Sequence, residues 1–244
     1  MASVLVTGSS GRIGRAVVSE LTRRGHVVRG FDRVPGAAGS DSVVGSLTDR
    51  AALDHAMRDI DTLIHLAATP DDADFLSEIL PNNLLGVYHV LESARLAGVK
   101  RLILASSGQV NWWQRESGQI PVRATDAASP RYWYAASKMF LESIGRGFAE
   151  MHGLSVIIAR LGWCPRTPAQ EQEIAEQNWA QDVYISPRDS GRFFACAVEA
   201  PETVRFAVVF GAGRPTHQVQ FDPSTAQSLL GFEPEDAWPE GLRE

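Results

Sequence analysis

The chain has 244 residues, of which 44% are hydrophobic and 21% charged, a balance typical of a globular protein that buries its core without disulfide bonds. The formal net charge is −6, the isoelectric point is about 5.6 and no basic run occurs, so we expect no nucleic-acid partner. No apolar stretch approaches the ~18 residues of a membrane span, and two isolated cysteines fit a reducing compartment, so we expect a cytoplasmic protein without a membrane partner.

The first fourteen residues predict a strand, a glycine turn and the start of a helix. Residues 4–6 (Val-Leu-Val) form an apolar run with two β-branched side chains, as a strand buried on both faces requires. Gly8 then allows a tight turn, Gly11 leaves room for a pyrophosphate, and Gly14 lets the helix pack close to the strand. The helix N-terminus would offer free N–H groups to phosphates. The stretch therefore predicts a dinucleotide site, and a turn without a ligand is the alternative.

The second predicted strand, residues 26–31, ends at an acidic residue. Asp32 lies 18 positions after Gly14, close to the spacing of a carboxylate that binds a ribose 2′-hydroxyl. This spacing strengthens the dinucleotide interpretation of the glycine turn.

Strands and helices then alternate along the chain. We expect strands at 43–44, 61–66, 101–105 and 154–161, with helices at 50–58, 73–97 and 132–151. The alternation predicts an α/β fold of the Rossmann type, a doubly wound parallel sheet with ligands at the carboxyl ends of its strands. The helix at 73–97 is expected to bury one apolar face, formed by Leu84, Val87, Tyr88, Leu91 and Ala94. His65 lies inside a strand, so we expect it to be packed rather than catalytic.

The alternation breaks down after residue 165. We therefore expect a dinucleotide-binding domain at 1–165 and a small C-terminal substrate-covering region at 166–244 that packs on it as one unit. Ser186 and Pro187 predict a helix that runs to about Glu199, followed by a strand at 204–210 and a helix at 224–230. Residues 111–132 resemble a loop, whose Trp112-Trp113 pair is either a packed lid or a substrate wall.

One pair of side chains predicts proton chemistry. Tyr134 and Lys138 are four residues apart in a predicted helix and therefore share a face. A phenol has an ordinary pKa near ~10, and a nearby ammonium group lowers it toward neutrality. Ser107, at the end of a strand, is the candidate to hold the substrate oxygen, and Ser106 is the alternative. A chance Tyr–Lys spacing is common, but here it follows a dinucleotide loop and a Ser-Ser strand end.

The motifs at 7–14, 65–68, 83–86, 106–107 and 134–138 resemble those of extended short-chain dehydrogenases/reductases, in the NAD-dependent epimerase/dehydratase group. The resemblance implies that Tyr134 is the acid/base, Lys138 its partner, which also binds the nicotinamide ribose, and Ser107 the residue that orients the hydroxyl. It implies that the cofactor site is formed by Gly8, Ser10, Gly11, Arg12, Ile13, Gly14, Asp32, Arg33, Leu47, Leu66, Ala67, Ala68, Asn83, Tyr134 and Lys138.

The acidic residue at the end of the second strand implies NAD as the cofactor. Asp32 would bind the ribose hydroxyls, whereas Arg12 and Arg33 could accept a 2′-phosphate, so NADP is the less favoured alternative.

Within the group, the chain most resembles uronate dehydrogenases, and its short C-terminal part suits a small, unactivated sugar. It departs from them at Gly108-Gln109, where they have Asn-His, and at Trp163, where they have a serine. The expected substrate-binding residues are Ser107, Gly108, Gln109, Trp112, Trp163 and Arg166, with Arg188 and Arg192 as further candidates for a substrate carboxylate. No metal site is expected.

These observations predict an NAD-dependent oxidoreductase that oxidises a hydroxyl of a small sugar or sugar acid. One alternative is an epimerase or dehydratase, which uses the same residues but returns the hydride to its substrate. Another is a protein that senses NAD(P) without catalysis, although such a protein has no need of a Tyr-Lys-Ser set. By analogy we expect a homodimer formed through the helices at 73–97 and 132–151.

Overall fold

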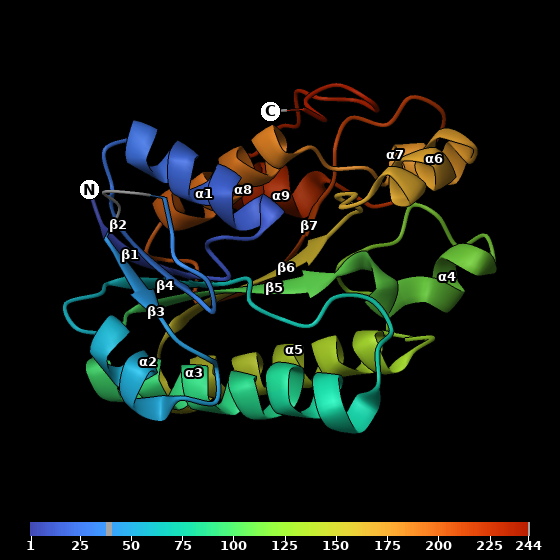
Figure 1. Cartoon of the computed structure of the whole chain (residues 1–244). Helices are drawn as coiled ribbons and strands as arrows, with labels where there is room; N and C mark the ends of the chain where they lie inside the picture. Colours follow the sequence, from blue (N-terminus) through green and yellow to red (C-terminus); the bar gives the residue numbers. More distant parts are fainter. Residues whose placement is uncertain (38–40, 244) are drawn as a thin grey trace.

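A computed structural model describes residues 1–37 and 41–243, and within them one parallel sheet of seven strands lies between two layers of helices (Figure 1). The strand order is β3-β2-β1-β4-β5-β6-β7. The strands are β1 (Ser3–Thr7), β2 (Val27–Asp32), β3 (Ser42–Val44), β4 (Thr62–His65), β5 (Arg101–Ser107), β6 (Ser155–Leu161) and β7 (Phe206–Gly211). The order reverses between β1 and β4, which confirms the doubly wound Rossmann-type fold.

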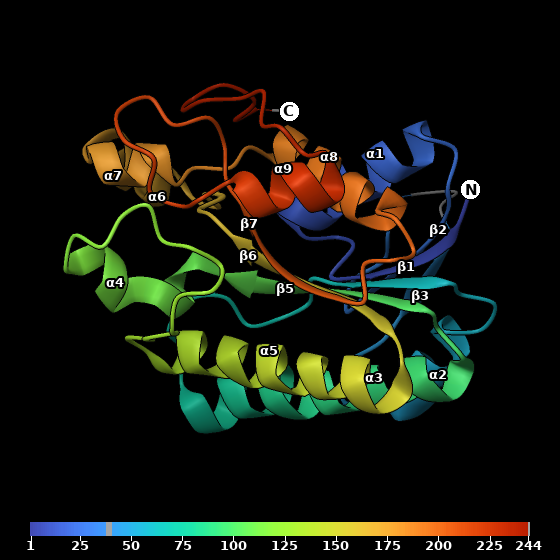
Figure 2. The same ribbon diagram turned by 180° about the vertical axis from the view of Figure 1, so that it is seen from behind.

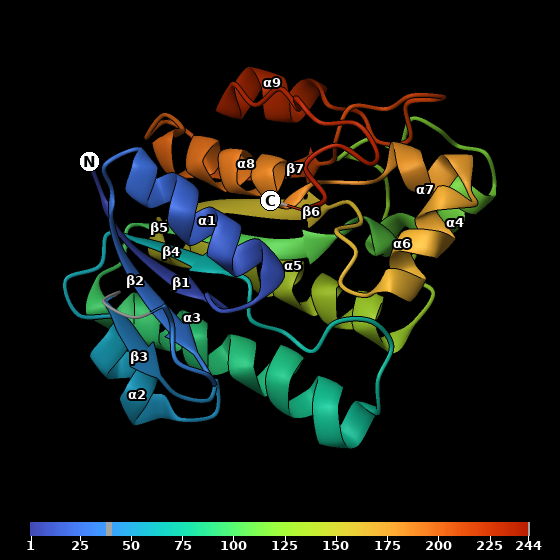
Figure 3. The ribbon, with the colours of Figure 1, turned by 45° about the horizontal axis from the view of Figure 1, so that its top comes forward.

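Helices cover both faces of the sheet. One layer contains α1 (Arg12–Arg23), α8 (Pro187–Glu199) and α9 (Ser224–Leu230); the other contains α2 (Arg50–Ala56), α3 (Gly86–Ala97) and α5 (Trp133–His152), as Figures 1 and 2 show. Three short helices lie beyond the carboxyl ends of β5 and β6 (Figure 3): α4 (Trp112–Glu116), α6 (Pro168–Ala175) and α7 (Asn178–Asp182). The cover over the strand ends is therefore built from small elements.

The sheet is buried on both faces because its strands alternate between two apolar layers. Val4 and Val6 pack with Phe193 under α1 and α8, whereas Leu5 packs with Leu102 over α2, α3 and α5. Every residue of β5 and β6 is buried. This rigid core holds the strand ends in place, and the side chains that follow them form the cavity described below.

The segment at 73–97 differs from the single α-helix that its spacing predicts. It begins as a π-helix, η1 (Phe75–Leu85), and continues as α3. Pro81 lies inside η1, and its missing N–H cannot complete the α-helical hydrogen-bond ladder. The predicted apolar face was wrong at Tyr88, which is 55% exposed, whereas Val90 is fully buried.

Residues 111–132 are not entirely a loop. A 3₁₀ turn, η2 (Gly108–Asn111), leads into α4, whose five residues are too few to show a helical period in the sequence. The helix predicted from Ser186 is confirmed: its hydroxyl accepts a hydrogen bond from the Asp189 amide at 2.8 Å, and α8 ends at Glu199.

The C-terminal part of the chain has two positions in the fold. Strand β7 pairs in register with β6, and α8 packs against α1, so these elements complete the central layers. Helices α6 and α7 instead lie over the strand ends (Figure 3). The division at residue 165 stays a prediction, but the covering role is confined to a few of the residues in 166–243.

His65 is packed, as its place in a strand predicts. It is 1% exposed, and its Nδ1 lies 2.8 Å from Thr7 Oγ1. Burial, helped by the charge of Lys138, lowers the pKa of His65 to about 3. The folded protein therefore keeps this ring neutral at pH values where an unfolded chain would protonate it.

Acid should destabilise the fold through His65. Below its unfolded pKa of 6.5 the unfolded chain binds a proton that the native state refuses, so the free energy of unfolding falls as the pH drops toward 3. In His65→Gln, the free energy of unfolding, measured by urea denaturation between pH 7 and 4.5, should fall less steeply with decreasing pH. The difference in slope should correspond to at most one bound proton. His55→Gln, at an exposed position, is the control. The same pH dependence in His65→Gln as in the wild type would show that the lowered pKa of His65 does not destabilise the fold in acid.

Candidate active site

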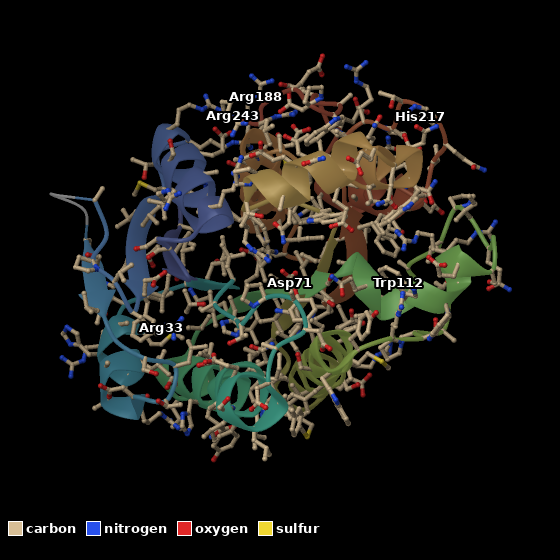
Figure 4. The ribbon with its side chains drawn as sticks, turned by 45° about the vertical axis from the view of Figure 1, so that its right-hand side comes forward. Arg33, Asp71, Trp112, Arg188, His217 and Arg243 are labelled. Atoms are coloured by element: carbon tan, nitrogen blue, oxygen red, sulfur yellow. The ribbon has the colours of Figure 1, made fainter. Side chains whose placement is uncertain are left out.

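A cavity of about 780 Å³ runs along the carboxyl ends of the strands. Figure 4 labels three residues along it: Arg33 near one end, Asp71 in the middle and Trp112 at the other end. The residues expected to bind cofactor or substrate line this cavity, with the exception of Asn83. One continuous space thus joins the two predicted half-sites at the carboxyl edge of the sheet.

The glycine turn forms the end of the cavity next to α1. At Gly14, a Cβ would lie 2.8 Å from Ser9 Cα and closer still to the Gly8 carbonyl oxygen, so only glycine lets the helix approach the turn. The N-cap of α1 is Gly11, which supplies no side-chain hydrogen bond. The first-turn N–H groups and the positive end of the helix are thus left for an anion, and the site fits a dinucleotide pyrophosphate.

Asp32 follows β2 and lines the same end of the cavity. Its carboxylate accepts hydrogen bonds from the amides of Ser10 at 3.0 Å and Val34 at 3.3 Å, which orient it beside the turn. Arg33 lines the cavity next to it. Arg12 also lines it, but its guanidinium donates to the Leu242 carbonyl oxygen in the C-terminal segment.

Asn83 supports the site from behind. Its amide accepts a hydrogen bond from the Thr69 N–H at 2.8 Å and donates to the Thr69 carbonyl oxygen at 3.0 Å and to Ser137 Oγ at 3.1 Å. These bonds tie η1 to the loop after β4 and to α5. Asn83 is therefore a positioning residue here and not part of the cavity wall, contrary to its place among the cofactor contacts.

Tyr134, Lys138 and Ser107 meet at the middle of the cavity. Lys138 Nζ donates to the Ala105 carbonyl oxygen at 2.9 Å and lies 5.6 Å from the centre of the Tyr134 ring. The Ser107 side chain lies close enough to the Tyr134 hydroxyl to lower the pKa of that phenol. Ser106 is engaged elsewhere, because its hydroxyl donates to Glu142 at 2.5 Å. The structure thus favours Ser107 over Ser106 as the residue beside the tyrosine.

The pKa of the tyrosine differs from the expectation. Burial raises the pKa of Tyr134 to about 12; the charge of Asp71 also raises it, while Arg166 and the Ser107 side chain lower it. Burial lowers the pKa of Lys138 to about 8. The expected lowering of the phenol pKa by the Lys138 ammonium is not what the pocket produces, because desolvation of the buried phenol is the largest contribution and raises its pKa. In the protein alone, Tyr134 is a proton donor at neutral pH.

The far end of the cavity is a wall of tryptophans. Trp163 stacks on Trp179 with ring centres 6.2 Å apart, and Trp112 meets Trp179 edge-on at 6.3 Å. Trp112 lines the cavity, whereas its neighbour Trp113 is 52% exposed, so the two indoles of the pair have different surroundings. The sequence indicated Trp112 and Trp163 but not Trp179, which α7 brings to them from a distant part of the chain.

Two arginines line this end. Arg166 forms an ion pair with Asp71, which also accepts a hydrogen bond from Gln170 at 3.2 Å. Arg115, which sequence reasoning missed, lies against Trp112 and Trp179. Its only local signal is its place one turn after Trp112.

The other candidates for a substrate carboxylate lie elsewhere. Arg188 is paired with Asp236, and Arg192 with Asp189 at 2.6 Å; neither lines the cavity. Cys164 does line it, but burial raises the pKa of its thiol to about 11, which fits a packed rather than a nucleophilic side chain.

Two further features of the described residues bear on function. No group of three or more histidine, cysteine, aspartate or glutamate side chains is arranged to hold a metal ion in 1–37 and 41–243. In the same residues no helix is both long and apolar enough to cross a membrane.

The strand order, the glycine turn and the Tyr134–Lys138–Ser107 group together define an enzyme of the short-chain dehydrogenase/reductase class. Comparison with protein families agrees. The sequence pattern of the NAD dependent epimerase/dehydratase family matches residues 4–163, and the chain belongs to this family. The resemblance seen in the sequence motifs is thereby confirmed.

Known relatives act on several kinds of sugar. The chain is 29% identical over 214 residues to L-arabinose 1-dehydrogenase (NAD(P)(+)) of Haloferax volcanii, with 82% of this chain and 84% of the relative covered. It is 26% identical over 256 residues to NAD-dependent glucose-6-phosphate dehydrogenase of the same organism, with 96% and 93% covered. A solved structure of a mutated uronate dehydrogenase superimposes with a TM-score of 0.81 at 27% identity, covering 99% of this chain and 86% of the other.

Proposed function

We propose that this chain is an NAD-dependent dehydrogenase that oxidises a hydroxyl of a small, unactivated sugar or sugar acid. One observation carries the proposal: Tyr134, Ser107 and Lys138 meet in a cavity whose other end is the glycine turn of α1 and the carboxylate of Asp32. Relatives that oxidise arabinose, glucose 6-phosphate or uronates support the reaction type. The small cover formed by α6 and α7 suits a substrate without a nucleotide.

In the proposed reaction, the protein side chains bind the substrate hydroxyl and remove its proton. Ser107 and Tyr134 would hold the substrate hydroxyl between their oxygen atoms, and Tyr134 would take its proton. When bound, NAD⁺ would supply the hydride acceptor, and the glycine turn and Asp32 would hold it. The charge of Arg166 and the Ser107 side chain oppose the burial that raises the pKa of Tyr134. Lys138 donates to the Ala105 carbonyl oxygen near the carboxyl end of β5 and so holds its ammonium group close to the phenol.

The experiment is to follow NADH absorbance with a panel of neutral, acidic and phosphorylated sugars. Steady accumulation of NADH supports a dehydrogenase. A sugar that changes configuration or loses water without net NADH would support the epimerase or dehydratase alternative, which uses the same Tyr134 and Ser107. Bound NAD without turnover on any sugar would support an NAD-sensing protein instead.

We propose NAD rather than NADP as the working cofactor, supported by the oriented carboxylate of Asp32. Asp32→Asn should lower kcat/KM for NAD by about 10-fold or more, since a hydrogen bond to a charged group contributes about 1.5–3 kcal/mol, and the value for NADP should rise relative to it. Asp59→Asn, exposed and with a positive φ that asparagine accepts, is the control. An unchanged ratio of the two values would rule out this role for Asp32.

We also propose a cytoplasmic homodimer. Apolar side chains are exposed on η1, on α3, which continues it, and on α5, which packs against η1; α3 and α5 are labelled in the lower layer of Figure 2. They are Leu76, Leu80, Leu85, Tyr88, Trp133 and Phe140. A second copy covering this patch would remove it from water. The free thiols of Cys164 and Cys196 suit a reducing cytoplasm.

The dimer can be tested by light scattering. Tyr88→Glu places a charge in the middle of the exposed patch and should halve the molar mass at micromolar concentration, because an unpaired charge in an apolar interface is costly. Val219→Glu, a charge at an exposed apolar position elsewhere, should leave the mass of a dimer unchanged. A wild-type protein with the mass of one chain would reject the proposal.

A further inference from the structure

Arg115 lies at the end of the cavity opposite the glycine turn, in a setting built for a flat cation. Its guanidinium carbon is 3.8 Å from the ring centre of Trp179 and 4.5 Å from that of Trp112. The side chain is 10% exposed, yet the residue lines the cavity. The two indoles meet at 78°, so the guanidinium can lie flat against at most one of them, and these cation–π contacts leave N–H groups for other partners.

The N–H donors of Arg115 find few acceptors among the described residues of the protein. Arg115 Nη2 lies 3.3 Å from Glu116 Oε1, a long contact to a carboxylate that is 47% exposed. A guanidinium has five N–H donors, and leaving a buried cation with one weak partner is costly. The structure therefore keeps a cation at the cavity wall that no facing carboxylate neutralises well.

The neighbouring indole shows the same mismatch. Trp112 Nε1 is buried and has no hydrogen-bond partner among residues 1–37 and 41–243. Trp112 is also part of the cavity wall. The Arg115 guanidinium is therefore the donor of α4 that a group in the cavity can reach, and the Trp112 N–H stays buried beside it without a partner in the described residues.

The second arginine at this end is less suitable as an anion site. Arg166 already forms an ion pair with Asp71, and Gln170 donates to the same carboxylate at 3.2 Å. A substrate anion at Arg166 would displace or face that carboxylate. Within the described part of the chain, the ion-pair partner of Arg115 is the exposed Glu116, on the same short helix. Charge and geometry therefore favour Arg115.

We propose that Arg115 binds the anionic group of the substrate, a carboxylate or a phosphate, and so selects charged sugars over their neutral counterparts. This inference rests on the proposed function and narrows its substrate to anionic sugars. Arg115 is a specificity residue and touches no reacting atom. The surrounding indoles keep the guanidinium largely out of water, which strengthens an ion pair formed there.

The test compares matched substrates that differ in one charged group. kcat/KM is measured for glucuronate and glucose 6-phosphate, each against glucose, and for galacturonate against galactose. The wild type should favour the charged member of at least one pair. Arg115→Met, which keeps the length of the side chain, should lower that preference about 10- to 100-fold, mainly through KM, because a charge-assisted hydrogen bond is lost. Arg115→Lys should retain part of it, since an ammonium group keeps the charge but not the planar edge.

Methionine and lysine keep the aliphatic part of the side chain that packs against the two indoles, so the fold should tolerate these changes. Arg131→Met is the matched control: Arg131 also lies over Trp112, with its guanidinium carbon 5.1 Å from the ring centre, but does not line the cavity. It should leave the charge preference as in the wild type. Equal losses on charged and neutral sugars in Arg115→Met, or a wild type with no charge preference, would overturn the inference while leaving the dehydrogenase proposal standing.

A binding measurement separates failure of the inference from failure of the reaction. Trp112 and Trp179 contact Arg115, so glucuronate or glucose 6-phosphate at this site should change indole fluorescence in the NADH-loaded protein. If no sugar is oxidised but these anions still bind in an Arg115-dependent way, the anion site stands and the proposed reaction fails. If neither anion changes the fluorescence of the wild type and no preference is seen in turnover, the anion site is rejected.

Discussion

Tyr134→Phe should lower turnover by about 10²- to 10⁴-fold, the range that positioned general acid–base groups contribute, while the Kd for NAD stays close to that of the wild type. The substitution removes the hydroxyl that meets Ser107 but keeps the ring next to Lys138. The glycine turn and Asp32, which support cofactor binding, lie at the other end of the cavity. Stopped-flow or steady-state NADH absorbance, together with calorimetric titration of NAD, measures both quantities.

The pH profile gives a second measurement of the same residue. The base is the phenolate, and the pKa of Tyr134 in the protein alone is raised to about 12 by burial. The oxidation rate of the wild type should therefore rise with pH above neutrality, and in Tyr134→Phe this rise should disappear. Tyr88→Phe, at an exposed position on α3, is the control for loss of a phenol. Substantial activity in Tyr134→Phe with the same pH profile would remove Tyr134 from the mechanism.

Gly14→Ala should have the largest effect on the structure itself. Its Cβ would lie 2.8 Å from Ser9 Cα and still closer to the Gly8 carbonyl oxygen, and both neighbours are backbone atoms that cannot rotate away. Helix α1 must move away from the turn, at a cost of about 3 kcal/mol or more. For a chain of this size, that corresponds to a fall in Tm of about 6–12 °C. The same displacement moves the first-turn N–H groups, so binding of NAD should be lost.

Gly147→Ala is the matched control. It introduces the same methyl group in the interior of helix α5, where the nearest atom outside the helix backbone is Met151 Cε at 3.6 Å, an ordinary contact. Alanine favours the helix over glycine by up to about 1 kcal/mol, so Tm should hold or rise. Differential scanning calorimetry and NAD titration distinguish the two variants. A Gly14→Ala protein with wild-type Tm and NAD affinity would show that close packing at the turn is not required.

Several features could be predicted because their causes lie within a few neighbouring residues. The glycine turn needs three glycines between a strand and a helix, and Tyr134 and Lys138 need only one helical turn to share a face. The N-terminus of α8 follows from Ser186 and Pro187 for the same reason. Alternating strands and helices then leave little choice of sheet topology, since parallel crossovers are right-handed.

Other features depend on atoms that the sequence separates widely. Nothing in the sequence distinguishes Ser106 from its neighbour Ser107. The position of Glu142 on α5 shows that the Ser106 hydroxyl is already hydrogen-bonded. The pKa of Tyr134 follows from how deeply the pocket buries the phenol and from Asp71, 63 residues away in sequence. Neither quantity has a local signature, and the local rule, which considered only Lys138, gave the wrong direction.

The fold and the cofactor class followed from the sequence alone, because short-range spacing sets strands, helices and the turn between them. That Tyr134, Lys138 and Ser107 carry the reaction stays a prediction of the same spacing. Only the tertiary structure decided what surrounds the substrate. Arg115 and Trp179 are 64 residues apart and meet because α4 and α7 both lie beyond the ends of β5 and β6 (Figure 3). Helices of five residues carry no periodic signal, so their positions are set by packing against the rest of the molecule and not by their own sequence.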